Sequence, residues 1–190
     1  VFTDLGVWGF NARYVTGVYL MGLPLEEILF FICIPYACLF SFHCFQVLMD
    51  RFISEKMVRA ITIGLCLFSF IMALLFIDRL YPAVTFLCLT VFLIYAGFIL
   101  KAEWLGQFYF TYLVMLVPFF IVNGILTGTG LEEPVVWYNS AEIINFRLLT
   151  IPFEDVFYGM LLIGMNVLLY KYFLSARPGV KPGRVILSER

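Results

Sequence analysis

The stretch Gly22–Tyr36, GLPLEEILFFICIPY, contains the pattern that decides the fold of this chain. Two adjacent carboxylates, Glu26 and Glu27, follow a proline and stand directly before a long apolar run. A second stretch, TIPFEDVFYGML from Thr150, has the same order of proline, two acids and apolar residues. Proline is pre-organised for the first turn of a helix, and acids there face the positive end of the helix dipole. Both stretches therefore predict the start of a helix.

The composition places these helices in a membrane. Of the 190 residues, 63% are hydrophobic and only 13% are charged, whereas a soluble domain carries roughly 25% charged residues. A bilayer is crossed by about 20 apolar residues, so we expect an all-α integral membrane protein. The net charge of −1 gives no electrostatic reason to bind nucleic acid. Five complete spans are predicted, at Leu25–Leu48, Met57–Ile77, Leu80–Leu100, Gly106–Leu126 and Ile151–Phe173.

Lysine and arginine are distributed unevenly between the two sides of these spans. The side of the opening segment and the loop 127–150 carries three, Arg13, Arg79 and Arg147. The positive-inside rule therefore predicts a multi-pass protein of the cell (inner) membrane with its C-terminus in the cytoplasm. The cytoplasmic side carries nine: Arg51, Lys56, Arg59, Lys101, Lys171, Arg177, Lys181, Arg184 and Arg190.

The two acid motifs belong to an internal repeat with an offset of 128 residues. Glu26 corresponds to Glu154, and Glu27 corresponds to Asp155. Trp8 and Trp137 miss this offset by one residue, as a single insertion would produce. The remaining matches at the same offset are Asn11 with Asn139, Leu23 with Ile151, Pro24 with Pro152, and Phe30 with Tyr158.

The repeat predicts a tandem arrangement of two three-helix units with a linking helix. Residues 1–50 form the first unit, 51–79 the linking helix, 80–174 the second unit and 175–190 a polar cytoplasmic tail. The counterparts of the first two helices of the second unit fall before Val1, so we expect seven spans in the full-length protein. An odd linker keeps both copies in one membrane orientation, which favours a pseudo-twofold axis along the membrane normal.

The acids have two interpretations. As helix-start residues at headgroup level, Glu26, Glu27, Glu154 and Asp155 need no further role. Neighbouring helical residues point about 100° apart, however, so one acid of each pair can face inward while the other supports it. Ionisable groups at membrane depth are costly and indicate function, and burial favours the protonated form that a proton donor needs.

Aromatic and amide side chains surround the acids. The rings belong to an interfacial belt, or they line a cavity where ring faces stabilise a carbocation. Asn11 and Asn139 either hydrogen-bond the acids or cap turns. The single histidine and five cysteines show no zinc-site spacing, so no metal is expected. The candidate substrate-binding residues are Trp8, Asn11, Phe30, Phe31, Trp137, Asn139, Phe157 and Tyr158.

The segments FTDLGVWGFNARYVTGVYLMGLPLEEILFFICIPYACLF and VWYNSAEIINFRLLTIPFEDVFYGML resemble the membrane-integral lycopene cyclases. These occur as paired small subunits in some bacteria and as fused domains in other bacteria and in fungi. The shared marks are W-x-x-N followed by P-x-E-[ED], once per copy. The second copy departs slightly, because it reads W-Y-N and Asp155 replaces the second glutamate.

The resemblance implies conversion of lycopene to β-carotene through γ-carotene, a redox-neutral reaction without flavin or NAD(P)H. A carboxylic acid protonates C2, the C5–C6 double bond attacks the resulting cation, and loss of the C6 proton gives the β-ring. The substrate would be lycopene or a related carotenoid within the bilayer. We expect Glu26 and Glu154 to be the proton donors, with Glu27 and Asp155 as their partners, because the first acid is glutamate in both copies.

Two alternatives stay open. One is a related enzyme that acts on C50 carotenoids or forms ε-ends, since product identity depends on which proton leaves. The other is a membrane transporter or binding protein whose acids carry protons. The sequence does not indicate an oligomeric state.

Overall fold

The computed structural model describes residues 2–49 and 53–175. It contains five long apolar helices, each long and apolar enough to cross a membrane. The predicted all-α membrane fold with five spans is therefore confirmed. The expected cytoplasmic tail and Arg51 lie outside the described residues. The helices are α1 (Leu25–Leu48), α2 (Glu55–Leu75), α3 (Leu80–Ile94, continued by the π-helix η2, Tyr95–Ile99), α4 (Leu105–Leu126) and α5 (Phe153–Ser175).

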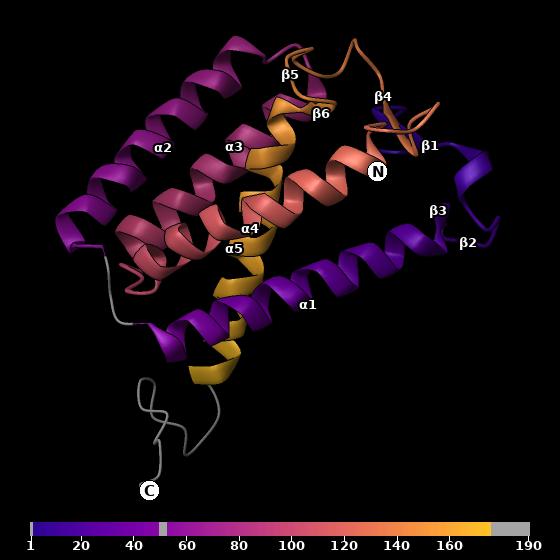
Figure 1. The fold of residues 1–190 in the computed structure, drawn as a ribbon. Helices are drawn as coiled ribbons and strands as arrows, with labels where there is room; N and C mark the ends of the chain where they lie inside the picture. The colour runs from indigo at the N-terminus through magenta and orange to yellow at the C-terminus, as the bar shows by residue number, and fades with distance from the viewer. Residues whose placement is uncertain (1, 50–52, 176–190) are drawn as a thin grey trace, which may run out of the picture.

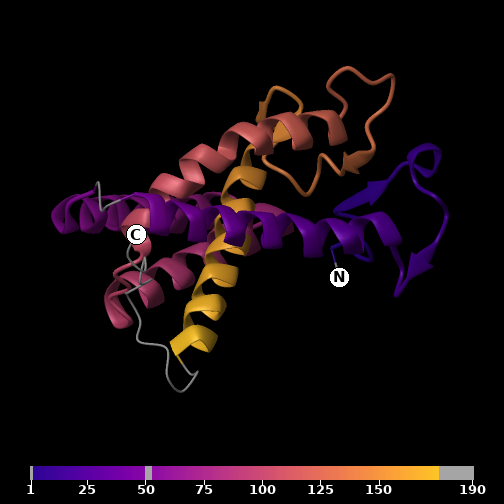
Figure 2. The ribbon, with the colours of Figure 1, turned by 60° about the horizontal axis from the view of Figure 1, so that its bottom comes forward.

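Helix α5 occupies the centre of the molecule (Figure 1). It packs against α3 on one side, and α1 crosses it on another, as Figure 2 also shows. Helix α4 contacts both α1 and α5, while α2 lies at the edge of the bundle against α3. Large side chains from four helices fill the space between them. They include Phe42, Phe92, Phe108, Tyr112 and Val167.

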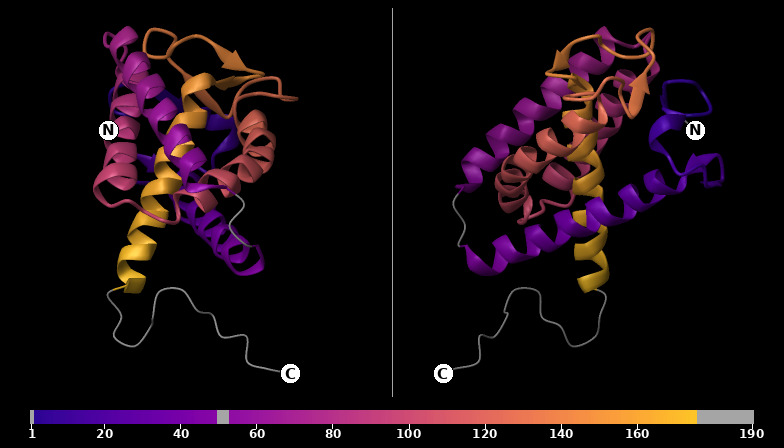
Figure 3. Two further views of the ribbon diagram at one scale, coloured as in Figure 1. Left: turned by 90° about the vertical axis from the view of Figure 1, so that its left-hand side faces the viewer. Right: turned by 45° about the vertical axis from the view of Figure 1, so that its right-hand side comes forward.

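Short strands gather where α1 and α5 begin, at one end of the bundle (Figure 3). Three antiparallel pairs form there. These strands were not predicted from the sequence, because each has only two or three residues. The pairs are β1 (Trp8–Phe10) with β4 (Val136–Tyr138), β2 (Tyr19–Leu20) with β3 (Leu23–Pro24), and β5 (Arg147–Leu148) with β6 (Ile151–Pro152); a short 3-10 helix, η1 (Ala12–Tyr14), follows β1.

The internal repeat is visible in the backbone. Hairpin β2–β3 and hairpin β5–β6 occupy positions 128 residues apart, and each leads directly into its helix. The residue that turns each hairpin has a positive φ, 53° at Met21 and 59° at Leu149. The N–H of Leu25 donates to the carbonyl of Val18, and the equivalent N–H of Phe153 donates to Phe146. The two loops therefore share one conformation.

Strands β1 and β4 join the two copies through a local twofold axis. Trp8 lies opposite Tyr138, Gly9 opposite Trp137, and Phe10 opposite Val136. The flanking bonds are reciprocal, because Asn11 N donates to Val135 O and Asn139 N donates to Val7 O. The axis thus passes between Gly9 and Trp137. The offset of 128 holds through both strands, so the interpretation of a single insertion is wrong: Gly9, rather than Trp8, is the equivalent of Trp137.

Gly9 is buried beneath the Trp137 ring. A Cβ added at Gly9 would lie 2.3 Å from Cζ2 of Trp137, far inside van der Waals contact. The indole therefore occupies the volume that a side chain at position 9 would need. Close approach of the two strands at the axis requires glycine here.

Helices α1 and α5 are equivalent in the repeat but differ in burial. The face of α5 that packs against α3 buries Met160, Leu161 and Gly164. The equivalent residues of α1 are Ile32, Cys33 and Tyr36, which are exposed. Within residues 2–49 and 53–175, no helix covers this face of α1 as α3 covers α5. The two further spans expected before Val1 stay a prediction.

The contact at the twofold axis gives a testable prediction. We expect Gly9→Ala to lower the free energy of unfolding by about 1–3 kcal/mol through overpacking. Adding Trp137→Ala should recover most of this loss, because it frees the volume. Thermal unfolding of the detergent-solubilised protein measures both. Gly64→Ala in α2 is the control, since its Cβ would meet nothing within 4 Å; equal loss in both glycine variants would contradict the steric argument.

Candidate active site

The first acid of each pair binds the loop that precedes its own helix. Oε1 of Glu26 accepts a hydrogen bond from the N–H of Thr16 at 2.8 Å. Oε1 of Glu154 accepts the equivalent bond from Ile144 at 2.9 Å, and its side chain is fully buried. In both residues Oε2 is buried without a hydrogen-bond partner in the described part of the chain. The first acid thus fastens a loop to a helix start in both copies.

The second acids face the interior. Glu27 from α1 and Asp155 from α5 line one cavity of about 110 Å³. The cavity lies beside the β1–β4 pair and is walled by α1, α3, α4 and α5, so residues from both copies meet in it. Its lining includes the aromatic residues Trp8, Phe30, Phe31, Tyr81, Phe119, Tyr138 and Tyr158.

Two tyrosine hydroxyls hold Asp155. Tyr81 donates to Oδ1 at 2.6 Å, and Tyr138 donates to Oδ2 at 2.8 Å. Asp155 is only 4% exposed, so these bonds replace the water that a carboxylate would otherwise bind. Burial raises the pKa of Tyr138 well above its ordinary value. The Asp155 carboxylate is the next largest cause, and Glu27 adds a smaller effect in the same direction. Tyr138 therefore remains a hydrogen-bond donor.

Glu27 has different surroundings from Asp155. Its side chain is half-buried, and the described residues provide it with no hydrogen-bond donor. The position equivalent to Tyr138 is Phe10, which has no hydroxyl group. Among the described residues, Asp155 therefore receives two hydrogen bonds in the cavity and Glu27 receives none.

The aromatic side chains beside the acids form two groups, one around Trp8 and Tyr81 and one on α1. Trp8 packs edge-on against Tyr81, with ring centroids 5.2 Å apart, and against Tyr158 at 6.4 Å. Tyr81 also lies 5.9 Å from Tyr158. Phe30 and Phe31, on α1, pack edge-to-face at 5.9 Å and line the cavity beside Glu27. Such rings present the negative face of their quadrupoles to a cation.

The two candidate asparagines shape turns. The side-chain oxygen of Asn11 accepts from Arg13 N at 3.0 Å, and that of Asn139 accepts from Ala141 N at 3.0 Å. Asn11 also donates to Glu133 at 2.7 Å. In the described residues neither side chain is hydrogen-bonded to an acid of the two pairs. Of the two interpretations, turn formation is the one that the geometry fits.

Two further candidates lie outside the cavity. Trp137 is 45% exposed and covers Gly9 on the far side of the strand pair. Phe157 packs against other phenylalanines, with centroids 5.2 Å from Phe68 and 5.1 Å from Phe86. Of the eight predicted substrate-binding residues, Trp8, Phe30, Phe31 and Tyr158 line the cavity.

Tyr81 and Tyr138 were not among the predicted site residues. Tyr81 lies in the first turn of α3, and its counterpart would fall before Val1, so the repeat gave no signal for it. Tyr138 belongs to the aromatic residues that precede the second acid pair, but its equivalent Phe10 has no hydroxyl group, so the repeat did not mark it as a partner of an acid. For Tyr81 the available signal was a hydroxyl-bearing ring in the first turn of a membrane span.

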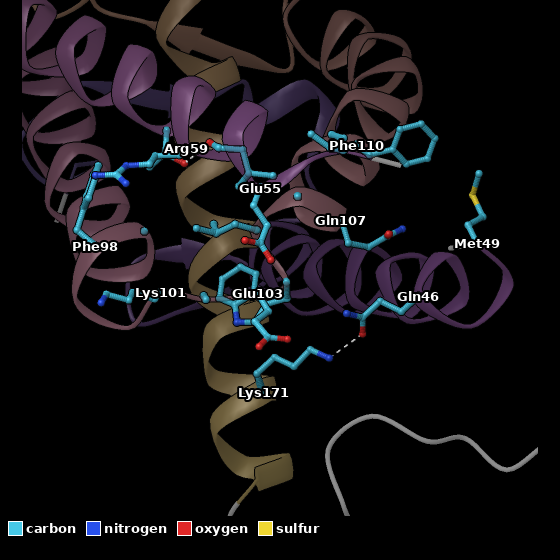
Figure 4. Close-up of a pocket in the computed structure, with 18 residues that line it drawn as sticks. Gln46, Met49, Glu55, Arg59, Phe98, Lys101, Glu103, Gln107, Phe110 and Lys171 are labelled. Carbon is cyan, nitrogen blue, oxygen red and sulfur yellow. Dashed lines mark hydrogen bonds between the residues drawn. The ribbon is translucent and has the colours of Figure 1, made fainter. Parts of the chain in front are cut away.

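A larger cavity, of about 840 Å³, lies at the opposite end of the bundle (Figure 4). Charged groups of both signs line it, and Lys171 donates to Gln46 there at 2.7 Å. This wall suits water and headgroups better than an apolar ligand. The second acid of each pair lines the smaller cavity, which is therefore the better candidate for chemistry. The charged lining residues are Glu55, Arg59, Lys101, Glu103 and Lys171.

Membrane-spanning helices and an acid-bearing cavity lined from both repeats define an integral membrane protein whose candidate site lies between the two copies. A sequence model of the family described as lycopene cyclase matches residues 1–45 and 78–173. The match covers most of the chain, and the chain belongs to the lycopene cyclase family, whose function is carotenoid cyclisation. No curated protein and no solved structure matched the chain.

The loop-fastening role of the first acids gives a stability prediction. Glu154→Leu leaves the N–H of Ile144 without its acceptor, so we expect a loss of about 1–3 kcal/mol in the free energy of unfolding. Glu154→Gln retains a carbonyl oxygen at the same place and should cost less. Thermal unfolding in detergent distinguishes the two. If Gln and Leu destabilise the protein equally, the hydrogen bond is not what Glu154 contributes.

Proposed function

We propose that this protein is a carotenoid cyclase that converts lycopene to β-carotene through γ-carotene. Family membership supports cyclisation in general, and one observation supports the acid mechanism. Glu27 and Asp155, from equivalent positions of the two copies, line the same aromatic cavity inside a membrane protein. Acid and base chemistry on a hydrocarbon needs carboxyl groups away from water, and this cavity provides two.

The reaction adds one proton and removes one. A carboxylic acid donates a proton to C2 of the terminal C1–C2 double bond, which leaves a cation at C1. The C5–C6 double bond attacks, a C1–C6 bond forms, and the positive charge moves to C5. Loss of the C6 proton to a carboxylate restores the C5–C6 double bond and completes the β-ring. No electrons are gained or lost, so the step needs no redox partner.

The aromatic lining suits the charge that develops. The ring faces of Trp8, Phe30 and Tyr158 stabilise a cation without reacting with it as water does. Exclusion of water also prevents capture of the cation as an alcohol. The cavity wall therefore supports both the rate and the outcome of cyclisation.

The structure leads us to reverse the expected roles within each acid pair. In our proposal Glu27 and Asp155 transfer the protons, because they face the cavity. Glu26 and Glu154, expected to be the donors, instead bind the backbone of Thr16 and Ile144. Neighbouring helical residues cannot serve the same face, so one acid of each pair is left to fasten the loop.

The size of the cavity matches a substrate end rather than a whole substrate. A volume of about 110 Å³ is on the scale of cavities that hold a single small ring. We propose that one end group enters while the remaining polyene lies along the helices in the bilayer. The protein would act in the cell (inner) membrane with its C-terminus in the cytoplasm.

Expression of the full-length protein in cells that accumulate lycopene tests the proposal. Chromatography of the pigments should show β-carotene, with γ-carotene at early times. Absence of any cyclic carotene, with the protein present in the membrane, would sink the proposed function.

Substitution of the four acids tests the assignment of roles. Glu27→Gln and Asp155→Asn should each lower cyclisation about 100-fold or more, because each removes a proton-transferring group. Glu26→Gln and Glu154→Gln are the matched controls and should retain activity within about tenfold, since the amide oxygen still accepts the loop hydrogen bond. Cyclisation rates normalised to membrane-bound protein provide the readout. The reverse pattern would restore the original expectation for the donors.

A further inference from the structure

We propose that the two cavity acids have different, fixed tasks: Glu27 donates the proton to the substrate, and Asp155, held by Tyr81 and Tyr138, removes the proton that completes the ring. This inference rests on the proposed cyclase function and assigns the two steps within it. It starts from a difference between the two copies. The twofold relation of β1 and β4 shows which residues of the two copies are equivalent, so their surroundings can be compared.

The hydrogen bonds to Asp155 favour its carboxylate. Both of its oxygens accept a hydroxyl proton, at 2.6 and 2.8 Å, and a carboxylate gains more from such bonds than a neutral acid does. Asp155 is only 4% exposed, and burial opposes ionisation of its carboxyl group. The hydroxyl groups of Tyr81 and Tyr138 offset this cost by donating hydrogen bonds to the carboxylate. Tyr81 and Tyr138 are therefore positioning residues that keep Asp155 as a proton acceptor.

A nearby cation supports the same assignment. The Arg147 guanidinium lies 5.9 Å from the centre of the ring of Tyr138, whose hydroxyl donates to Asp155 at 2.8 Å. The equivalent position in the first copy is Tyr19, which carries no charge. The second copy thus combines a hydroxyl donor and a cation where the first copy has Phe10 and Tyr19.

Glu27 is suited to the opposite task. The described residues give it neither a hydrogen bond nor an ion-pair partner, although Tyr138 and Tyr158 line the same cavity, and its neighbours on α1, Phe30 and Phe31, are apolar. A half-buried carboxyl in such surroundings favours its neutral, protonated form. A neutral acid beside an apolar wall can approach a carbon–carbon double bond and give up its proton.

The protons balance over one ring closure. Glu27 loses its proton to C2, the C1–C6 bond forms, and Asp155 receives the proton from C6. Asp155 is then neutral and Glu27 ionised. One proton passes from Asp155 back to Glu27 before the next closure, and no other reactant is consumed.

The assignment predicts which acid controls the ring type. The base decides which proton leaves: removal from C6 gives a β-ring, and removal from C4 gives an ε-ring. We expect Tyr81→Phe, Tyr138→Phe and the longer Asp155→Glu each to lower the rate roughly tenfold and to shift the β-to-ε ratio several-fold. Glu27→Asp should lower the rate without changing the β-to-ε ratio, because protonation at C2 takes place before a proton leaves C6 or C4.

Phe10→Tyr is the matched control, since it places a tyrosine at the position equivalent to Tyr138. A hydroxyl near Glu27 would stabilise its carboxylate, so this variant should slow cyclisation and leave the β-to-ε ratio unchanged. Pigments from lycopene-accumulating cells expressing each full-length variant give rate and ratio, normalised to membrane-bound protein.

The outcomes separate this inference from the proposed function. Cyclic products from the wild type, with an unchanged ratio in all three variants at Tyr81, Tyr138 and Asp155, would overturn the division of tasks alone. A ratio that moves with Glu27→Asp or Phe10→Tyr would also overturn it. Lack of cyclic products from the wild type would overturn the proposed function instead. Asp155→Glu keeps the charge, so the test survives if a tyrosine variant fails to accumulate.

Discussion

The antiparallel pairing of β1 with β4 is the constraint on which the rest of the site depends. These three-residue strands lie 128 residues apart in the chain and bind each other through a local twofold axis. Each strand is followed by a loop that ends at a helix, and the first acid of that helix binds the loop backbone. The pairing therefore sets the relative positions of α1 and α5. With both helix starts fixed, their second acids meet in one cavity.

The arrangement resolves a conflict between two properties of carboxyl groups in membranes. A buried carboxyl is unfavourable when charged, yet proton transfer needs one group that gives a proton and one that takes it. The duplicated motif supplies two carboxyls at equivalent positions, and sequence differences around them supply unequal environments. Tyr138 and Arg147 belong to the second copy only, because Phe10 and Tyr19 take their places in the first. Duplication thus provided the number of acids, and divergence provided their chemical difference.

The membrane spans could be predicted from sequence because apolar length is a strong local signal. α1 begins and ends where it was predicted, and α5 begins two residues later than predicted. The repeat was also readable, since Pro24 and Pro152 mark the same turn. The sequence did not reveal which acid of each pair faces inward. A shift of one residue turns a helical side chain by about 100°, and only packing decides which side of the helix faces the interior. Tyr81 was missed because it joins the site through tertiary contact with α5, which no sequence spacing records.

The contact between Gly9 and Trp137 has a consequence for how such a protein can arise. Residues on a twofold axis face their own equivalents, so two identical units would present the same side chain from both sides. Two tryptophans would compete for one volume, and two glycines would leave it empty. In this protein the axis is close-packed because the two copies differ at this position. One copy carries the indole and the other carries the space for it, so at this position the two copies are complementary rather than interchangeable.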